Sequence, residues 1–263
     1  MKFKKIRSLV GKLFSEKNQM LIILWLSEIF WKLRKYFLGV EIEYPNEFLV
    51  NWKSIKNISS QDKERNFTVY QLVKLHNKLF EGKQTNVIEF GSDRGATLTT
   101  ISKFIKKDTS IFSVDSFGLH AEEIKKNVSK FDEHYHGRYK PFTKETRFEN
   151  FNHVEMTKNL NDFLVKKNSK LETIVGYFPK LEDQDMKKII NLKFSFVHLD
   201  YDLYQSTIDS FNFIKNKLEK NALILFDDYN LINQEGVKHA VADLKIDLDR
   251  GIQTQSGQLI LFN

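Results

Sequence analysis

Five short apolar runs alternate with helical stretches between residues 87 and 226, and this alternation constrains the fold more than any other feature of the chain. The apolar runs are Val87–Phe90, Ile111–Val114, Glu172–Val175, Phe194–Leu199 and Ala222–Phe226. The helical stretches include Phe67–Phe80, Leu98–Ile105, Val154–Val165 and Ser206–Leu218, and a terminal strand is expected over Gly257–Phe262. Such alternation predicts an α/β fold, with a mostly parallel central sheet and helices on both of its faces.

The basic excess of the chain lies in its first 40 residues. The whole chain carries 41 Lys and Arg against 34 Asp and Glu, and residues 1–40 hold nine of these basic and two of these acidic side chains. The remaining residues are therefore neutral overall, so no nucleic-acid partner is expected. The sequence contains no Cys, which excludes disulfides and Cys-ligated metals and fits a reducing compartment such as the cytoplasm.

Residues 1–60 are expected to form a basic helical appendage and a connector, ahead of a globular domain over residues 61–263. The apolar run from Met20 to Leu26 is too short to span a membrane, since a spanning helix needs about 20 largely uncharged residues. Two interpretations of the appendage stay open. Its large aromatic side chains favour packing on the domain, and its basic residues would suit peripheral contact with a membrane or a partner. Homo-oligomerisation also stays open.

Glycines and an acidic residue follow the first two apolar runs. Gly91 and Gly95 come after the first run, at the edge of the sheet where ligands bind in folds of this kind. Two glycines four residues apart are a weak signal, because ordinary turns look the same. Asp115 and Ser116 end the second run, where an acidic side chain can accept hydrogen bonds from both hydroxyls of a ribose. Together the two segments favour a nucleoside-binding site.

Acidic residues follow the fourth and fifth apolar runs. Asp200 comes directly after the fourth, and Asp227 and Asp228 come directly after the fifth. These strands are expected to be neighbours, so the three carboxylates should converge, and no Lys or Arg adjoins either acidic segment in the sequence. Carboxylates that share a site repel one another unless a cation is bound, and their oxygens suit Mg²⁺ or Mn²⁺. The sequence therefore predicts a divalent metal site.

Five motifs, in order, resemble those of the macrocin O-methyltransferase family. These motifs are Glu89 with Gly91 through Gly95, Asp115-Ser116-Phe117, Gly176-Tyr177-Phe178, Asp200 through Ser206, and Asp227-Asp228-Tyr229 followed by Ala240-Val241. The match runs over residues 60–263, which is far more specific than any single motif. The resemblance implies a Rossmann-like class I methyltransferase fold. It also implies a metal-dependent enzyme that uses S-adenosylmethionine to methylate a sugar hydroxyl of a glycan or small-molecule natural product.

The resemblance also assigns roles to individual residues. In the cofactor site, it implies Glu89, Gly91, Gly95 and Thr97 at the methionine end, Asp115 and Ser116 at the ribose, and Tyr177 and Phe178 at the adenine. Asp200, Asp227 and Asp228 would hold Mg²⁺ or Mn²⁺, which orients the acceptor hydroxyl and lowers its pKa. Asp200 is the first candidate for the base that removes the hydroxyl proton, with His198 or a loop histidine (His134 or His136) in reserve.

The chain departs from the family pattern at three places. Tyr201 and Lys220-Asn221 stand where the family usually has glycines, and Asn230 stands where some relatives carry a histidine.

Two alternative functions fit the sequence less well. A nicotinamide-dependent oxidoreductase would require a Gly-x-Gly-x-x-Gly turn, which the first turn lacks. A non-catalytic protein that docks on a membrane or partner is the other alternative, and the intact set of aspartates argues against it.

Overall fold

The computed structural model describes residues 43–126, 128–132, 148, 151–231 and 235–263. The chain divides after Leu49, and the unit that follows is Val50–Asn263. The boundary expected at residue 60 falls inside this unit. The basic segment of residues 1–42 lies outside the described residues, and with it the helix expected there. None of the helices in the described ranges is long and apolar enough to cross a membrane.

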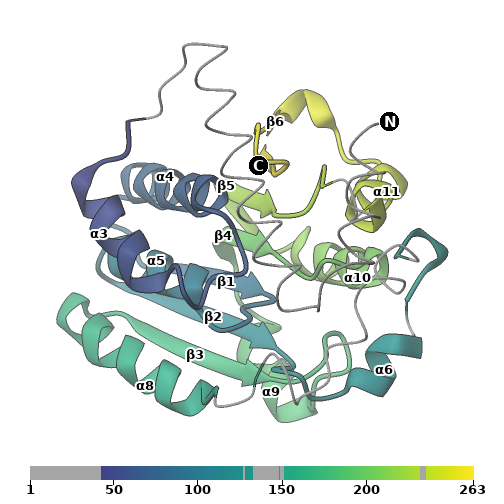
Figure 1. Ribbon diagram of the computed structural model, residues 1–263, viewed down its shortest axis with the longest axis horizontal. Coiled ribbons are helices and arrows are strands. Elements are labelled where there is room, and N and C mark those ends of the chain that lie inside the picture. Colours follow the sequence, from purple (N-terminus) through teal and green to yellow (C-terminus); the bar gives the residue numbers. More distant parts are fainter. Residues whose placement is uncertain (1–42, 127, 133–147, 149–150, 232–234) are drawn as a thin grey trace, which may run out of the picture. The chain divides into compact units, whose positions relative to one another are not determined.

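A seven-stranded sheet forms the centre of the unit Val50–Asn263, in the order β3-β2-β1-β4-β5-β7-β6. The strands are β1 (Thr85–Phe90), β2 (Thr109–Asp115), β3 (Lys170–Val175), β4 (Phe194–Leu199), β5 (Leu218–Phe226), β6 (Gly251–Gln253) and β7 (Leu259–Phe262). Strands β1 to β5 pair in parallel, and β7 runs antiparallel to both of its neighbours. All five predicted parallel strands and the predicted terminal strand are present (Figure 1), which confirms the α/β fold.

Helices cover both faces of the sheet. They are α3 (Asn46–Ile55), α4 (Lys63–Leu79), α5 (Ala96–Phe104), α6 (Ala121–Lys126), α8 (His153–Leu164), α9 (Asp183–Ile189), α10 (Tyr204–Ile214) and α11 (Glu235–Asp243), with 3-10 turns η1 (Lys130–Asp132), η2 (Val165–Lys167) and η3 (Leu248–Arg250). Side chains alternate between the faces along each strand. In β1, Val87 packs with α4, α5 and α8, and Ile88 packs with α9, α10 and α11.

Two elements differ from the sequence-based expectation. Residues 46–55 form helix α3, where the sequence suggested a connector. The turn residues Pro45 and Asn46 stand at the start of this helix, where they are well tolerated. Helix α10 ends at Ile214 rather than at Leu218, because the chain reverses there and the Phe194 N–H of β4 bonds to the carbonyl of Lys217 at 2.7 Å.

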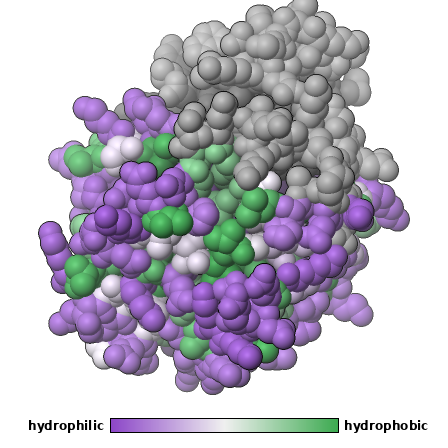
Figure 2. Space-filling model, turned by 90° about the horizontal axis from the view of Figure 1, so that it is seen from below, coloured by the Kyte–Doolittle hydropathy of each residue, from purple (hydrophilic) through white to green (hydrophobic). Residues whose placement is uncertain are grey.

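The surface of the described residues carries few large apolar side chains. Figure 2 shows one face, on which hydrophilic side chains predominate and apolar ones stand in small groups. Of the most exposed large apolar side chains, Val154 and Val165 lie on α8 and at the start of η2, and Val50 lies on α3. Scattered apolar residues of this kind are normal for a protein surface and identify no docking face.

Candidate active site

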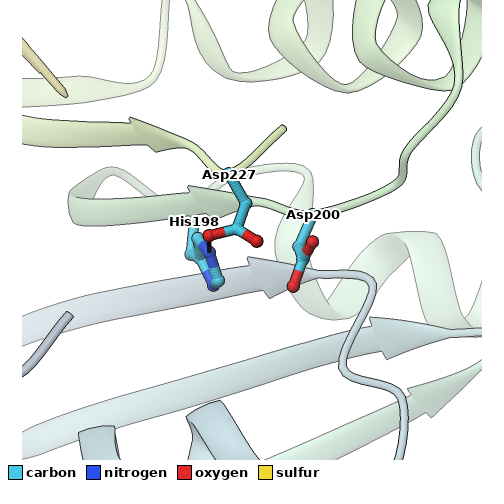
Figure 3. Close-up of side chains that lie close together, drawn as sticks. All are labelled: His198, Asp200 and Asp227. Atoms are coloured by element: carbon cyan, nitrogen blue, oxygen red, sulfur yellow. Dashed lines mark ion pairs between the residues drawn. The ribbon is translucent and has the colours of Figure 1, made fainter. Parts of the chain in front are cut away.

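The acidic residues after β4 and β5 lie close together at the carboxyl edge of the sheet. The two strands pair in parallel with Leu199 opposite Phe226, so the residues that follow them begin at the same level. Ligand atoms of His198, Asp200 and Asp227 all lie within 4.8 Å of one another (Figure 3). The same is true of Asp200, Asp202 and Asp228. Asp202, which the sequence interpretation did not single out, therefore joins the cluster.

An arginine from a distant part of the sequence reaches this cluster. Arg65, in the first turn of α4, forms ion pairs with Asp227 and with Asp228 through a single guanidinium nitrogen, Nη2. The sequence interpretation found no basic residue beside the acids, because Arg65 precedes Asp227 by 162 positions. Both partners are buried, so the ion pairs are shielded from solvent. The carboxylates are therefore partly neutralised by the chain itself.

Two glutamines supply neutral hydrogen bonds to the same carboxylates. The Gln61 side-chain amide donates to Asp200 Oδ2 at 2.9 Å and to Asp227 Oδ2 at 2.8 Å. Gln258, in the turn before β7, donates to Asp227 Oδ1 at 2.5 Å. Both oxygens of Asp227 are thus engaged. By contrast, Asp228 Oδ2 is buried and has no hydrogen-bond partner among the described residues.

The aspartates differ in acidity because their surroundings differ. Burial raises the pKa of Asp200 to about 7, and the charge of Asp228 adds to this effect. Burial also acts to raise the pKa of Asp228, but Arg65, a side-chain hydrogen bond with Asp202 and the charge of His198 together lower that pKa overall. Near neutral pH, Asp200 can therefore exchange a proton, while Asp228 stays ionised.

His198 and Glu89 form a buried pair beneath the aspartates. His198 Nδ1 lies 2.8 Å from Glu89 Oε1, and both side chains are completely buried. Burial acts to lower the pKa of His198, but the hydrogen bond and charge of Glu89 raise it overall. Its Nε2 lies 3.5 Å from Asp227 Oδ1, so His198 connects Glu89 with the acidic cluster.

The turn between β1 and α5 depends on two glycines. Gly91 and Gly95 have φ angles of 85° and 80°, in the left-handed region that other residues seldom adopt. A Cβ atom at Gly91 would stand 2.1 Å from the carbonyl oxygen of Asp200, and one at Gly95 would stand 2.2 Å from Met156 Sδ. The first glycine lets this turn approach the acidic segment after β4, and the second lets it approach α8.

Asp115 organises the same turn from the end of β2. Its Oδ2 accepts hydrogen bonds from the backbone N–H groups of Ser92 at 2.6 Å and Asp93 at 2.8 Å, and its Oδ1 accepts one from Phe117 at 2.7 Å. Burial raises the pKa of Asp115 to about 6, against the effect of these bonds. A carboxylate oxygen can accept a second hydrogen bond, so Asp115 keeps the capacity to bind a ligand hydroxyl.

The remaining residues that the resemblance assigned to the cofactor occupy different environments. The Thr97 hydroxyl, at the start of α5, donates to Gln61 Oε1 at 3.3 Å, which links the turn to the acidic cluster. Ser116 and Tyr177 follow β2 and β3, which are neighbours in the sheet. The Phe178 ring lies in the core, with its centroid 5.1 Å from that of Phe90.

Tyr201 stands where the family has a glycine. Its side chain packs next to the turn instead of pointing into solvent. Its hydroxyl donates to the carbonyl of Val114 at 3.3 Å, and its ring packs against Phe90. Burial, together with the charge of Asp115, raises the pKa of Tyr201 well above its usual value. Tyr201 therefore stays neutral and supports the segment that carries Asp115. The loop histidines His134 and His136 lie outside the described residues.

Solved structures of methyltransferases share this fold. The O-methyltransferase NovP matches with a TM-score of 0.54 at 16% identity, over 76% of this chain and 80% of that chain. CalS11, a calicheamicin methyltransferase, matches with a TM-score of 0.53 at 16% identity, over 85% of this chain and 95% of that one. An apo structure of CalS11, described as a TDP-rhamnose 3'-O-methyltransferase, gives a TM-score of 0.51 at 17% identity, with coverages of 90% and 93%.

These similarities confirm the Rossmann-like class I methyltransferase fold. The sequence profile of the macrocin-O-methyltransferase family (TylF) matches residues 77–255, more than half of the chain. The chain belongs to this family and is a methyltransferase that depends on S-adenosylmethionine, which confirms the resemblance and sets aside the oxidoreductase and non-catalytic alternatives. No protein of curated function matches the sequence.

Proposed function

We propose that the enzyme transfers a methyl group from S-adenosylmethionine to a sugar hydroxyl of a glycan or natural product, with help from Mg²⁺ or Mn²⁺. The observation that carries this proposal is the cluster of Asp200, Asp202, Asp227 and Asp228 beside the glycine turn after β1. The family description and the sugar-nucleotide activity in the CalS11 description support a sugar acceptor.

The cofactor would lie over the carboxyl edges of β1 and β2. Gly91 and Gly95 would allow the methionine end close to the backbone, with Glu89 and Thr97 beside it. The acceptor position that remains on Asp115 Oδ1 would accept a ribose hydroxyl, with Ser116 next to it. Tyr177 would border the adenine, and Phe178 would support Tyr177 from the core.

The acidic residues fit a divalent ion. Their donor atoms are carboxylate oxygens, which Mg²⁺ and Mn²⁺ prefer. The buried Asp228 Oδ2 lacks a hydrogen-bond partner among the described residues, so it is available to bind a cation. Asp200, Asp227 and Asp228 would hold the ion, with Asp202 within reach. When bound, Mg²⁺ would orient the acceptor hydroxyl and lower its pKa.

Asp200 would act as the base. Its carboxylate lies in the cluster that would receive the acceptor hydroxyl and could take up the proton of that hydroxyl. The hydroxyl oxygen then forms a bond to the methyl carbon while the carbon–sulfur bond breaks. The electron pair of that bond stays on sulfur, which turns the sulfonium into the thioether of S-adenosylhomocysteine. His198, which pairs with Glu89 and lies next to Asp227, would remain the reserve candidate for the base.

A methyl-transfer assay would test the proposal. Full-length protein is incubated with methyl-labelled S-adenosylmethionine and a panel of sugar nucleotides and glycans, with Mg²⁺ or with excess chelator. We expect label in at least one sugar acceptor with Mg²⁺ and none with chelator. Equal transfer in chelator would refute the metal requirement. Binding of S-adenosylmethionine without labelling of any sugar would refute the acceptor class but leave the methyltransferase class intact.

A further inference from the structure

The guanidinium of Arg65 lies between two of the aspartates proposed to hold the metal. We propose that Arg65 is a built-in counter-ion of the acidic cluster, which keeps the metal-free site folded and competes with the divalent ion for Asp227 and Asp228. The inference rests on the proposed metal dependence. It assigns a positioning role to a residue outside the family motifs that identified the site.

Arg65 contacts two carboxylates through one nitrogen of its guanidinium rather than through a planar fork. An arginine that binds carboxylates firmly usually donates through two N–H groups in a planar fork. Here a single nitrogen, Nη2, contacts both Asp227 Oδ2 and Asp228 Oδ1. The buried Nε has no hydrogen-bond partner among the described residues. Arg65 thus contributes a point of positive charge between two carboxylates, which is also what a bound cation would contribute.

The cluster has enough carboxylates to bind both the Arg65 guanidinium and a divalent ion, although not at the same carboxylate oxygens. Arg65 contacts Asp227 and Asp228, Asp200 and Asp202 complete the cluster, and His198 is paired with Glu89. Negative charge therefore remains for a divalent ion. Arg65 nevertheless repels that ion at short range and engages an oxygen of each of two proposed ligands, so its presence must weaken metal binding.

Gln61 offers a matched control because it reaches the same atom without a charge. Its amide donates to Asp227 Oδ2, the oxygen that Arg65 also contacts. A change at Gln61 therefore removes a hydrogen bond from this oxygen but leaves the guanidinium in place. A general loosening of the site would alter metal binding in both variants, whereas a counter-ion effect would appear only when the charge of Arg65 is lost.

The test measures Mn²⁺ binding by calorimetry and electron paramagnetic resonance in full-length wild type, Arg65→Gln, Arg65→Lys and Gln61→Met. We expect Arg65→Gln to tighten the Mn²⁺ dissociation constant at least about ten-fold, because one repelling charge is removed. Arg65→Lys and Gln61→Met should stay within about three-fold of wild type. In chelator, Arg65→Gln should melt at a lower temperature than wild type, and saturating Mn²⁺ should remove that difference.

The inference would be overturned if Arg65→Gln bound Mn²⁺ no more tightly than wild type does. It would also be overturned if Gln61→Met bound Mn²⁺ as tightly as Arg65→Gln does. If no variant binds Mn²⁺, the metal part of the proposed function fails as well, which an assay of methyl transfer in chelator would show independently. If Arg65→Gln does not fold, wild-type crystals with and without Mn²⁺ decide the question. Arg65 should leave at least one aspartate in the Mn²⁺ form, and an ion bound with both contacts intact would contradict the competition.

Discussion

Asp115 has two tasks that a single carboxylate can perform only while it is ionised. It holds the turn after β1 through three backbone N–H groups, and we propose that it also accepts the ribose hydroxyls of the cofactor. Its pKa of about 6 lies close to physiological pH. Small changes in acidity therefore alter the fraction of enzyme that is ready to bind the cofactor.

We expect affinity for S-adenosylmethionine to fall as the pH drops below about 6. Protonation of Asp115 removes the negative charge that strengthens its hydrogen bonds to the ribose, and at pH 5 about nine-tenths of a group with a pKa near 6 is protonated. Calorimetry between pH 5 and pH 8 should show roughly ten-fold weaker binding at the acidic end. Asp115→Asn should bind weakly at every pH, and a pH profile parallel to that of wild type would exclude Asp115 as its source.

Asp227→Asn should abolish most methyl transfer while cofactor affinity stays nearly constant. Asp227 lies at the end of β5, away from the turn that holds Asp115, so loss of its charge acts on the metal and the acceptor. The substitution also leaves Arg65 and Gln258 with a weaker acceptor, so the free energy of unfolding should fall by about 3 kcal/mol.

Activity, cofactor binding and chemical denaturation measured on the same preparation separate these effects. A matching loss of cofactor affinity would show that the metal and nucleoside sites are not distinct.

The acidic residues of the site could be predicted from sequence, whereas their partners could not. Asp200 and Asp227 follow buried apolar runs, and parallel pairing of those runs brings the residues after them together. Gln61 precedes Asp200 by 139 positions, and no spacing pattern links residues so far apart. The inference that no basic side chain neutralises the acids failed for this reason. It considered neighbours along the chain, whereas Arg65 is a neighbour only in space.

At the scale of elements, the turn between β1 and α5 shows how two similar glycines respond differently to substitution. A side chain at Gly91 would meet the backbone of the segment after β4, which cannot move without disturbing Asp200. A side chain at Gly95 would meet only the thioether of Met156, at the end of a flexible side chain. The first constraint is therefore rigid, and the second can be relieved.

Gly95→Ala should destabilise the protein by about 1–2 kcal/mol from the left-handed backbone alone, and by more from the contact with Met156. The double variant Gly95→Ala with Met156→Ala should lose less stability than the sum of the two single variants, because the shorter side chain leaves room for the new Cβ. Urea denaturation of all four proteins measures this coupling. Additive losses would mean that backbone strain alone explains the cost.

Helix α3 and strand β6 mark the limit of prediction at this scale. Strands β1, β2 and β4 were predictable because they are largely buried runs, and β3 and β5 because their apolar residues join the same core clusters. Helix α3 was taken for a connector because the turn-forming residues Pro45, Asn46 and Asn57 lie at or near its ends. In the structure Asn51 is buried and donates to Thr100 at 2.8 Å, so tertiary contacts decide its conformation. Strand β6 has only three residues, too few for a pattern.

At the scale of the whole molecule, the basic segment before residue 43 should not be required for cofactor binding. The residues proposed to bind the cofactor lie between Glu89 and Phe178, well inside the unit Val50–Asn263. A chain that begins at Glu43 should bind S-adenosylmethionine within about two-fold of the full chain. Sedimentation of both forms with anionic liposomes tests the membrane interpretation of the segment separately. A shortened chain that folds but does not bind would show that the segment helps to build the site.

The partners of Asp227 come from both ends of the unit, and the ribosome makes those ends at different times. Arg65 is synthesised well before the aspartates, and Gln258 is added after them. The sheet can begin to form as β1, β2 and β3 emerge, but Asp227 gains its last donor only when β7 has paired with β5. Until that moment Asp227 lacks one of its native donors. The hydrogen bonds of the proposed metal site are therefore completed only after the last strand has been synthesised.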